Sequence, residues 1–588
     1  MKKIGAVFCW LVMVDVHAQP FVGSGQPGAE PFDVLISEVM ADPLPSAGLP
    51  EAEYLELYNT CSQPVSLNGW RLTFEDETVV LGDEEMRPGG RLIVCDAGDA
   101  GLFESYGPVC GIPAMPAINN DGEWLMLADG SGRLISFAAF TDSWYGDGPK
   151  SSGGWSVEQT DPSNPCGGPG NWTASLDPRG GTPGTVNSVA ARNPDLYGPR
   201  FEYAGLEGTS RVLLHFSEPL DEQEAAKAGR YHVPGMGAPV EAVLRKPDMK
   251  TVELTYDRSF LPGRLHRMFL DDGITDCCGN RLEGSLQVVV AVPQWPHPGD
   301  WLINEVMWDP PPGGADYVEL YNHSGEVLDL RDLYLAGTPD SQPSSAKVSA
   351  ASRLVLPGSR VVLTEDAADV SSRYHVACPH HLVEVQQLPA LPNGQGQVTL
   401  QDGHHQVIDH MAYSEQMHFP LLSGTEGVAL ERTRADAPNG NNGDLLAEAP
   451  GDATQRWHSA SATSGFGTPT GANSQCAEGV SSAAAQMALE REVFSPDGDG
   501  RNDVLKLQYR FGEPGNMVTI RIYDAMGRLV RLLVNHQATG TSGVFTWDGT
   551  DGRHRPVAAG IYALDAEVYR LSGYSRRFRL ACVVARRR

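Results

Sequence analysis

Short alternations of apolar and polar residues recur along this 588-residue chain, and they predict β-strands. Residues 35–40 read Leu-Ile-Ser-Glu-Val-Met, and residues 54–58 read Tyr-Leu-Glu-Leu-Tyr. With a period of two residues, alternate side chains lie on opposite faces of a strand. The intervening stretches are dense in Pro and Gly, and no long run has the 3.6-residue period of an amphipathic helix. We therefore predict an all-β fold of antiparallel sandwiches.

The strand pattern occurs twice in the chain. Residues 35–43, Leu-Ile-Ser-Glu-Val-Met-Ala-Asp-Pro, return at 302–310 as Leu-Ile-Asn-Glu-Val-Met-Trp-Asp-Pro. The register continues through Tyr106 and Cys110, which align with Tyr374 and Cys378. A duplicated module of about 150 residues favours a tandem array over a single enzyme domain.

Each copy ends on a similar phrase. Residues 181–188 read Gly-Thr-Pro-Gly-Thr-Val-Asn-Ser, and residues 467–474 read Gly-Thr-Pro-Thr-Gly-Ala-Asn-Ser. Together with the Tyr-Leu/Val-Glu-Leu-Tyr-Asn strand and Leu-Asn-Gly-Trp at 67–70, the opening motif resembles the lamin-tail domain of secreted bacterial proteins. The resemblance implies tandem Ig-like sandwiches, and it departs at Arg331-Asp332, where the first copy has Gly69-Trp70.

Four polar residues recur in both copies and have two interpretations. A cluster of carboxylates is typical of a site for a hard cation such as calcium. The alternative, which we favour, is that these side chains hold loop and strand-end backbone groups in place. The recurring pairs are Glu38/Glu305, Asp42/Asp309, Glu56/Glu319 and Asn59/Asn322.

Two further regions resemble other Ig-like families. Phe-Ser-Glu-Pro-Leu at 216–220 and Ile-Thr-Asp-Cys-Cys-Gly-Asn at 274–280 are similar to an Ig-like domain of bacterial surface-layer and adhesion proteins, which usually serves as a spacer. Ile-Arg-Ile-Tyr-Asp at 520–524 and Ala-Gly-Ile-Tyr at 559–562 resemble the C-terminal Ig-like module of type IX secretion, related to the flagellar hook-capping fold. That resemblance implies Bacteroidetes-type export and a secretion machinery as partner.

These resemblances and the N-terminus predict the domain organisation. Lys2-Lys3, the apolar residues 4–14 and Val16-His17-Ala18 form an expected secretory signal. No later stretch has the length needed to span a bilayer. The predicted parts are a signal peptide at 1–18, lamin-tail-like domains at 33–190 and 299–475, an Ig-like domain at 193–292, a linker at 476–488 and a sorting domain at 489–588.

A Gly-rich acidic loop lies near the start of the last domain and suggests calcium as a cofactor. It is not an EF-hand, because Arg501 and Gln508 stand where that motif needs acidic ligands. An Asx-rich turn is the favoured alternative. The candidate metal ligands are Asp497, Asp499, Asn502 and Asp503.

The net charge of the chain restricts its partners. The formal net charge is −30, so nucleic acid, whose phosphates would be repelled, is not an expected partner.

Signal cleavage would leave nine of the ten cysteines. Cys61 aligns with Ser324 and Cys95 with Thr364, and this joint absence from the second copy suggests a Cys61–Cys95 disulfide.

We identify no catalytic residue, because the common hydrolase, metalloprotease and phosphate-binding motifs are missing from the sequence. Histidines gather in the second copy, either as a zinc site or as ordinary turn residues. Aromatic residues offer either a sugar platform or a sandwich core. The histidines are His380, His381, His404, His405, His410 and His418, and the aromatics are Trp144, Tyr145, Trp155 and Trp172.

The sequence thus predicts a non-enzymatic protein, secreted or held on the outer-membrane surface, that acts as a scaffold or adhesin for an extracellular protein or polysaccharide ligand. One alternative is a polysaccharide-binding accessory protein. A second alternative is a hydrolase that uses carboxylates from different domains.

Overall fold

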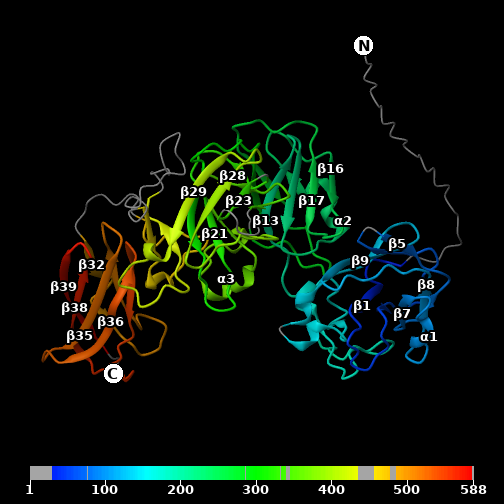
Figure 1. Cartoon of the computed structure of the whole chain (residues 1–588), viewed down its shortest axis with the longest axis horizontal. Coiled ribbons are helices and arrows are strands. Elements are labelled where there is room, and N and C mark those ends of the chain that lie inside the picture. Colours follow the sequence, from blue (N-terminus) through cyan, green and yellow to red (C-terminus); the bar gives the residue numbers. More distant parts are fainter. Residues whose placement is uncertain are drawn as a thin grey trace, which may run out of the picture. The chain divides into compact units, whose positions relative to one another are not determined.

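The computed structural model describes residues 29–585 apart from 76, 147, 285, 332, 339–344, 435–455 and 477–484. Strands dominate it, which confirms the all-β prediction, and the chain divides into two compact units, residues 1–196 and 197–588 (Figure 1). The predicted signal peptide and most of the predicted linker lie outside the described residues. Within the described ranges, no helix combines the length and the apolar character that crossing a membrane requires.

The first unit is a sandwich of a six-stranded and a four-stranded sheet. The six-stranded sheet has the order β12 (Trp172–Ala174), β11 (Val157–Gln159), β1 (Val34–Met40), β2 (Tyr54–Asn59), β7 (Arg91–Asp96) and β8 (Val109–Ile112). The other has the order β10 (Leu134–Thr141), β9 (Gly122–Ala128), β4 (Arg71–Phe74) and β5 (Glu77–Val80). The remaining elements are β3 (Val65–Ser66) paired with β6 (Glu85–Met86), the helix α1 (Ala100–Phe103) and the 3-10 turns η1 (Asp142–Tyr145), η2 (Pro149–Ser152) and η3 (Gly168–Asn171).

The second unit begins with a smaller two-sheet element. Its sheets have the orders β13 (Phe201–Glu207), β14 (Arg211–Phe216), β17 (Thr251–Thr255), β16 (Glu241–Leu244), and β15 (Tyr231–His232), β18 (His266–Leu270), β19 (Gln287–Val290). The helix α2 (Glu222–Ala225) and the turn η4 (Ala228–Arg230) belong to the same region.

The repeated module returns next with the same strand order. Its six-stranded sheet is β31 (Trp457–Ser459), β30 (Leu430–Arg432), β20 (Trp301–Met307), β21 (Tyr317–Asn322), β26 (Arg360–Thr364) and β27 (Leu382–Glu384). Its four-stranded sheet is β29 (Val407–Ser414), β28 (Gln395–Gln401), β23 (Tyr334–Ala336) and β24 (Ser345–Lys347). The pair β22 (Leu328–Asp329) and β25 (Leu354–Val355), the helix α3 (Ala367–Arg373) and the turns η5 (Pro379–His381), η6 (Glu415–Met417) and η7 (Ala462–Ser464) complete it. This agreement confirms the internal repeat.

One part of the predicted alignment is wrong. In the first module Ile93 of β7 pairs with Val109 of β8, and in the second Val362 of β26 pairs with Leu382 of β27. Because β7 and β26 have the same place in their sheets, Val109 corresponds to Leu382. Cys110 therefore lies on a strand, whereas Cys378 lies in a longer turn before the corresponding strand.

The chain ends in a sandwich of a three-stranded and a five-stranded sheet. The first has the order β32 (Gln486–Leu489), β34 (Leu505–Arg510), β37 (Ser542–Trp547), and the second β33 (Val493–Phe494), β39 (Ser575–Val584), β38 (Gly560–Tyr569), β35 (Asn516–Asp524), β36 (Leu529–Thr539). The Gln475 side chain donates to the Thr539 carbonyl, and the Thr541 amide donates to the Ser474 carbonyl. The end of the second module therefore binds the last sandwich directly.

Candidate functional site

A row of three buried glutamates crosses the six-stranded sheet of each lamin-tail-like module. In the first module Glu38 of β1 pairs with Glu56 of β2 on one side and Glu158 of β11 on the other. All three side chains are buried. The corresponding residues of the second module are Glu305, Glu319 and Glu431. We call each set the glutamate row.

A β-bulge gives each row its place on the sheet. The register of β1 against β2 shifts between Ile36 and Glu38, and that of β20 against β21 shifts between Ile303 and Glu305. A bulge adds one residue and so changes which face the following side chains occupy. The central glutamate consequently lies on the face that points away from the core between the two sheets.

Two segments cover these rows, and we call residues 181–189 and 467–475 the closing segments. In the first module the amides of Thr182 and Gly184 donate to Glu38 and Glu56 at 2.7 and 2.8 Å. The amide of Val189 donates to Glu158 at 3.2 Å. Each glutamate of the row thus accepts a backbone hydrogen bond from the closing segment.

The second module repeats this arrangement bond for bond. The amides of Thr468, Thr470 and Gln475 donate to Glu305, Glu319 and Glu431 at 2.9, 2.6 and 2.8 Å. Asparagines of the closing segments also reach the bulges: Asn187 donates to the Ser37 carbonyl, and Asn473 to the Asn304 carbonyl. The shared phrase at the end of each copy is therefore the cover of the glutamate row.

Burial raises the pKa values of several of these glutamates. Burial and the neighbouring carboxylates raise the pKa of Glu38 to about 8. Burial also raises the pKa of Glu56, although the Arg91 guanidinium opposes the effect. In the second module burial and the Glu305 carboxylate raise the pKa of Glu431 to about 8. At neutral pH Glu38 and Glu431 are therefore largely protonated.

These contacts confirm the structural interpretation for the recurring glutamates, the recurring asparagines and Asp42. Besides the glutamates, Asn59 donates to the Gln63 and Met86 carbonyls. Asn322 donates to the corresponding Glu326 and Val355 carbonyls. Asp42 accepts from the amide of Leu44, and Asp309 from the Asn393 side chain. The sequence did not point to Glu158 and Glu431, because their distances along the chain from Glu38 and Glu305 differ between the copies.

The acidic loop of the last sandwich brings three of its four predicted ligands together. Oxygens of Asp497, Asp499 and Asp503 all lie within 4.8 Å of one another. Asp503 also accepts from the amides of Gly498 and Gly500 at 2.7 and 2.8 Å, as an Asx-rich turn requires. Asn502 is directed elsewhere, because its side-chain oxygen accepts from Arg491.

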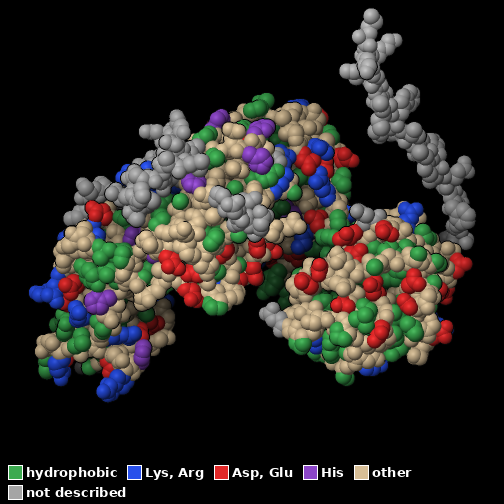
Figure 2. All heavy atoms as spheres, in the orientation of Figure 1, with side chains coloured by type: hydrophobic (Ala, Val, Ile, Leu, Met, Phe, Trp, Pro, Cys, Tyr) green, Lys and Arg blue, Asp and Glu red, His purple; other side chains and the backbone are tan. Residues whose placement is uncertain are grey.

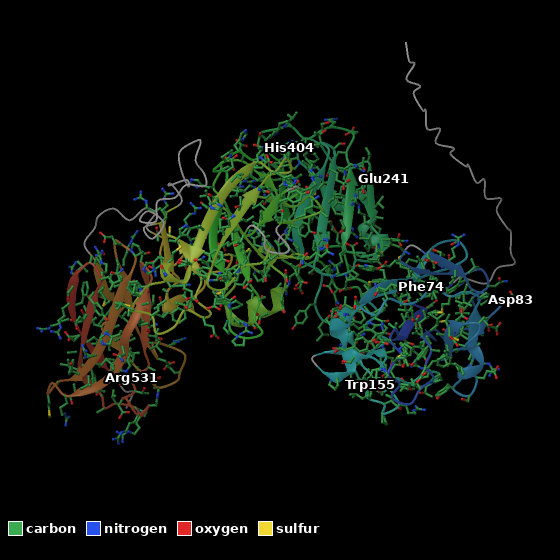
Figure 3. The ribbon with its side chains drawn as sticks, in the orientation of Figure 1. Phe74, Asp83, Trp155, Glu241, His404 and Arg531 are labelled. Carbon is green, nitrogen blue, oxygen red and sulfur yellow. The ribbon has the colours of Figure 1, made fainter. Side chains whose placement is uncertain are left out.

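The histidines of the second module fall into separate places. His410 and His418 are buried and bond the hydroxyls of Thr399 and Ser459 at 2.9 and 3.0 Å. His404, labelled in Figure 3, lies on the Trp295 ring with centroids 5.1 Å apart, and His405 lies on the Tyr334 ring at 5.0 Å. His380 and His381 lie together, with ring centroids 4.8 Å apart. Next to them, burial raises the pKa of the Cys378 thiol, which disfavours an activated nucleophile.

The aromatic candidates are mostly core residues. Trp144 and Trp172 are buried, and their ring centroids lie 5.3 Å apart. Trp155, labelled in Figure 3, is half-buried and has the Lys150 ammonium 4.4 Å from its ring centroid. Tyr145 packs against the core. These contacts favour the core interpretation over a flat sugar-binding platform.

The predicted Cys61–Cys95 disulfide is wrong, because both thiols are free. Cys95 is buried beside Tyr54 and Phe103, on the covered face of the sheet. The Cys61 thiol donates to Asn59 at 3.0 Å, as the hydroxyl of Ser324 does to Asn322 at 2.7 Å in the second module. Cysteine and serine serve the same local contact here, so their exchange between the copies carries no information on pairing.

Two family models match parts of the chain. The lamin tail domain matches residues 27–142, and the FlgD Ig-like domain matches residues 495–571. Both matches support Ig-like domains in these regions. No curated protein matches the chain.

Several solved structures have a distant likeness to it. The N-terminal part of the bacterial S-layer protein SbsC is 14% identical, with a TM-score of 0.17, over 37% of this chain and 44% of that one. FlgD from P. aeruginosa is 20% identical, with a TM-score of 0.13, over 18% and 78%. A tetra-tandem repeat of a large adhesion protein is 10% identical, with a TM-score of 0.13, over 94% and 99%. The chain thus spans less than half of the SbsC fragment.

The glutamate row predicts a pH dependence of stability. The pKa of Glu38 rises from 4.5 to about 8 on folding, so between these values the folded first module holds a proton that the unfolded chain releases. The contribution of Glu38 to the free energy of unfolding should be largest below pH 4.5 and decline as the pH rises to about 8. Urea unfolding at a series of pH values in this range, monitored by hydrogen exchange in β1 and β2, should show this decline in the free energy of unfolding of the wild type. The decline should be smaller in Glu38→Gln. The exposed Glu51→Gln is the control, and equal slopes for all three proteins would contradict the prediction.

Proposed function

We propose that this protein is a non-enzymatic scaffold or adhesin, exported to the cell surface or the medium, in which Ig-like modules display a binding surface for an extracellular protein or polysaccharide. The lamin-tail and FlgD Ig-like matches support a series of such modules. Acidic side chains are spread over the visible face of the first unit, as suits a solvated surface (Figure 2).

The burial of the glutamate rows beneath the closing segments is the observation that carries this proposal. A duplicated enzyme would keep its catalytic carboxylates open to substrate, since a general acid or base must come within hydrogen-bond reach of it. Here the central glutamates Glu38 and Glu305 are fully buried and bonded to the closing segments. Each row lies within one module, so it also gives no support to a hydrolase built from carboxylates of different domains.

We also propose that the last sandwich is the export signal of a type IX route, as its sequence resemblance implies. Its match to the FlgD Ig-like domain supports a separate Ig-like module at this end of the chain. Its acidic loop is proposed to hold calcium through Asp497, Asp499 and Asp503, because clustered carboxylates on a Gly-rich turn suit a large oxygen-seeking ion.

Truncation tests the export proposal. Deletion of residues 489–588 should leave the protein in the periplasm, whereas the full chain should reach the outer-membrane surface or the medium. Fractionation of the native organism with an antibody against the first module measures both. A deletion of residues 193–292 is the control for loss of an Ig-like element, and it should still be exported. If the chain without residues 489–588 is exported normally, the sorting proposal is wrong.

Calcium addition tests the proposed metal site. A ligand that binds only the folded state at about 100 times its Kd stabilises that state by about 2.7 kcal/mol. The melting temperature of the last sandwich should therefore rise with calcium in the wild type but not in Asp499→Ala. Asp551→Ala is the matched control, because Asp551 forms an Asx turn with the amides of Arg553 and Arg555 outside the cluster. A rise that persists in Asp499→Ala would place calcium elsewhere.

A further inference from the structure

The second lamin-tail-like module has a turn that its first copy lacks. Tyr106 and Val109 of the first module correspond to Tyr374 and Leu382 of the second, so the connection to the sixth strand is longer in the second copy. The added residues include Cys-Pro-His-His at 378–381, which contains the 3-10 turn η5. We call residues 378–381 the Cys-His turn.

Three metal-ligating side chains converge in the Cys-His turn. The Cys378 sulfur lies 3.1 Å from Nε2 and 3.7 Å from Nδ1 of His380. One ligand atom from each of Cys378, His380 and His381 lies within 4.8 Å of the other two. The ligands of a tetrahedral zinc ion, bound at about 2.0–2.3 Å, lie roughly 3.5 Å apart, so only small side-chain rotations are needed.

The backbone of the turn is held from both sides, which fixes the main-chain positions of the three ligand residues before any ion binds. The Cys378 amide donates to the Thr470 hydroxyl at 2.8 Å, and the Ala377 amide donates to the Pro469 carbonyl at 3.3 Å. Both partners belong to the closing segment. On the other side Arg353 donates to the His380 carbonyl at 2.5 Å. A fixed turn lowers the entropy that metal binding would otherwise cost.

We infer that the Cys-His turn is a binding site for a thiophilic divalent cation such as zinc, with Cys378, His380 and His381 as ligands and a fourth position open to water or to a partner. One thiolate and two imidazoles form a ligand set that favours zinc over calcium or magnesium, which prefer oxygen. Binding converts the thiol to a thiolate and releases its proton.

The surroundings are compatible with one metal ion of this class. The exposed His380 and the half-buried Cys378 and His381 leave the ion a path from solvent. The Arg353 guanidinium lies nearby and works against a bound cation, while it donates to the His380 carbonyl and lies over the Tyr203 ring, 4.1 Å from the ring centroid. The thiolate offsets part of its charge. The site is independent of the proposed scaffold function and of the proposed calcium loop.

Zinc titration of the metal-free full chain by calorimetry, in a non-thiol reductant, tests the inference. The wild type should bind one zinc ion at this site, and Cys378→Ser and His380→Ala should each weaken that binding by about tenfold or more, since even outer partners of a metal site are worth 10–100-fold. The double variant Cys61→Ser, His404→Ala is the matched control. It removes a free thiol and an exposed histidine outside the turn, and it should bind as the wild type does.

Cobalt(II) provides a second measurement that needs no variant. Cobalt bound by the wild type should show a thiolate-to-cobalt charge-transfer absorption, and Cys378→Ser should lose it. Unfolding midpoints equal to the wild type's show that the variants are folded. Absence of zinc binding, unchanged affinity in the turn variants, equal loss in the control, or cobalt bound without the thiolate band would each overturn the inference.

Discussion

The structure of both lamin-tail-like modules depends on covering a row of carboxylates on the face of the six-stranded sheet that points away from the core. A buried carboxylate is costly unless it is hydrogen-bonded or protonated. The closing segments meet this need with three backbone amides per row, and protonation of Glu38 and Glu431 removes part of the remaining charge. The cover in turn buries the second face of the sheet, so β1 and β20 are buried along their whole length.

The same contacts extend beyond the module in the second unit. Gln475 donates its amide to Glu431 and its side chain to the Thr539 carbonyl of the last sandwich. Thr470, which has a left-handed φ of 61°, bonds Glu319 with its amide and the Cys378 amide with its hydroxyl. In the first module Gly184, with a φ of 76°, occupies the place of Thr470 and lacks a side chain for such a bond. The closing segment of the second module thus links its glutamate row to the last sandwich and to the Cys-His turn.

Much of the fold could be predicted from the sequence, because strand alternation and the duplicated phrases are local signals. The covered face could not, since Thr182 is 144 positions from the Glu38 that it bonds. Glu158 and Glu431 were missed because loops of unequal length precede them. Tyr374 and Cys378 have the same spacing as Tyr106 and Cys110, so the spacing favours an alignment of the two cysteines and does not show the longer turn before β27. The acidic loop was predicted from its residues, but the direction of Asn502 depends on Arg491, on another segment.

Substitution of the glycine that begins each closing segment tests this account most directly. A Cβ atom at Gly181 would lie 2.5 Å from the Tyr54 hydroxyl and 2.7 Å from a Glu38 oxygen, and one at Gly467 would lie 2.8 Å from the Tyr317 hydroxyl. Gly82 has no heavy atom within 4 Å of such a position and is the control. We expect Gly181→Ala and Gly467→Ala each to lower the free energy of unfolding of its own module by about 1–3 kcal/mol, measured by hydrogen exchange in β1 and β20, with Gly82→Ala nearly unchanged. Wild-type exchange in both closing-segment variants would contradict the account.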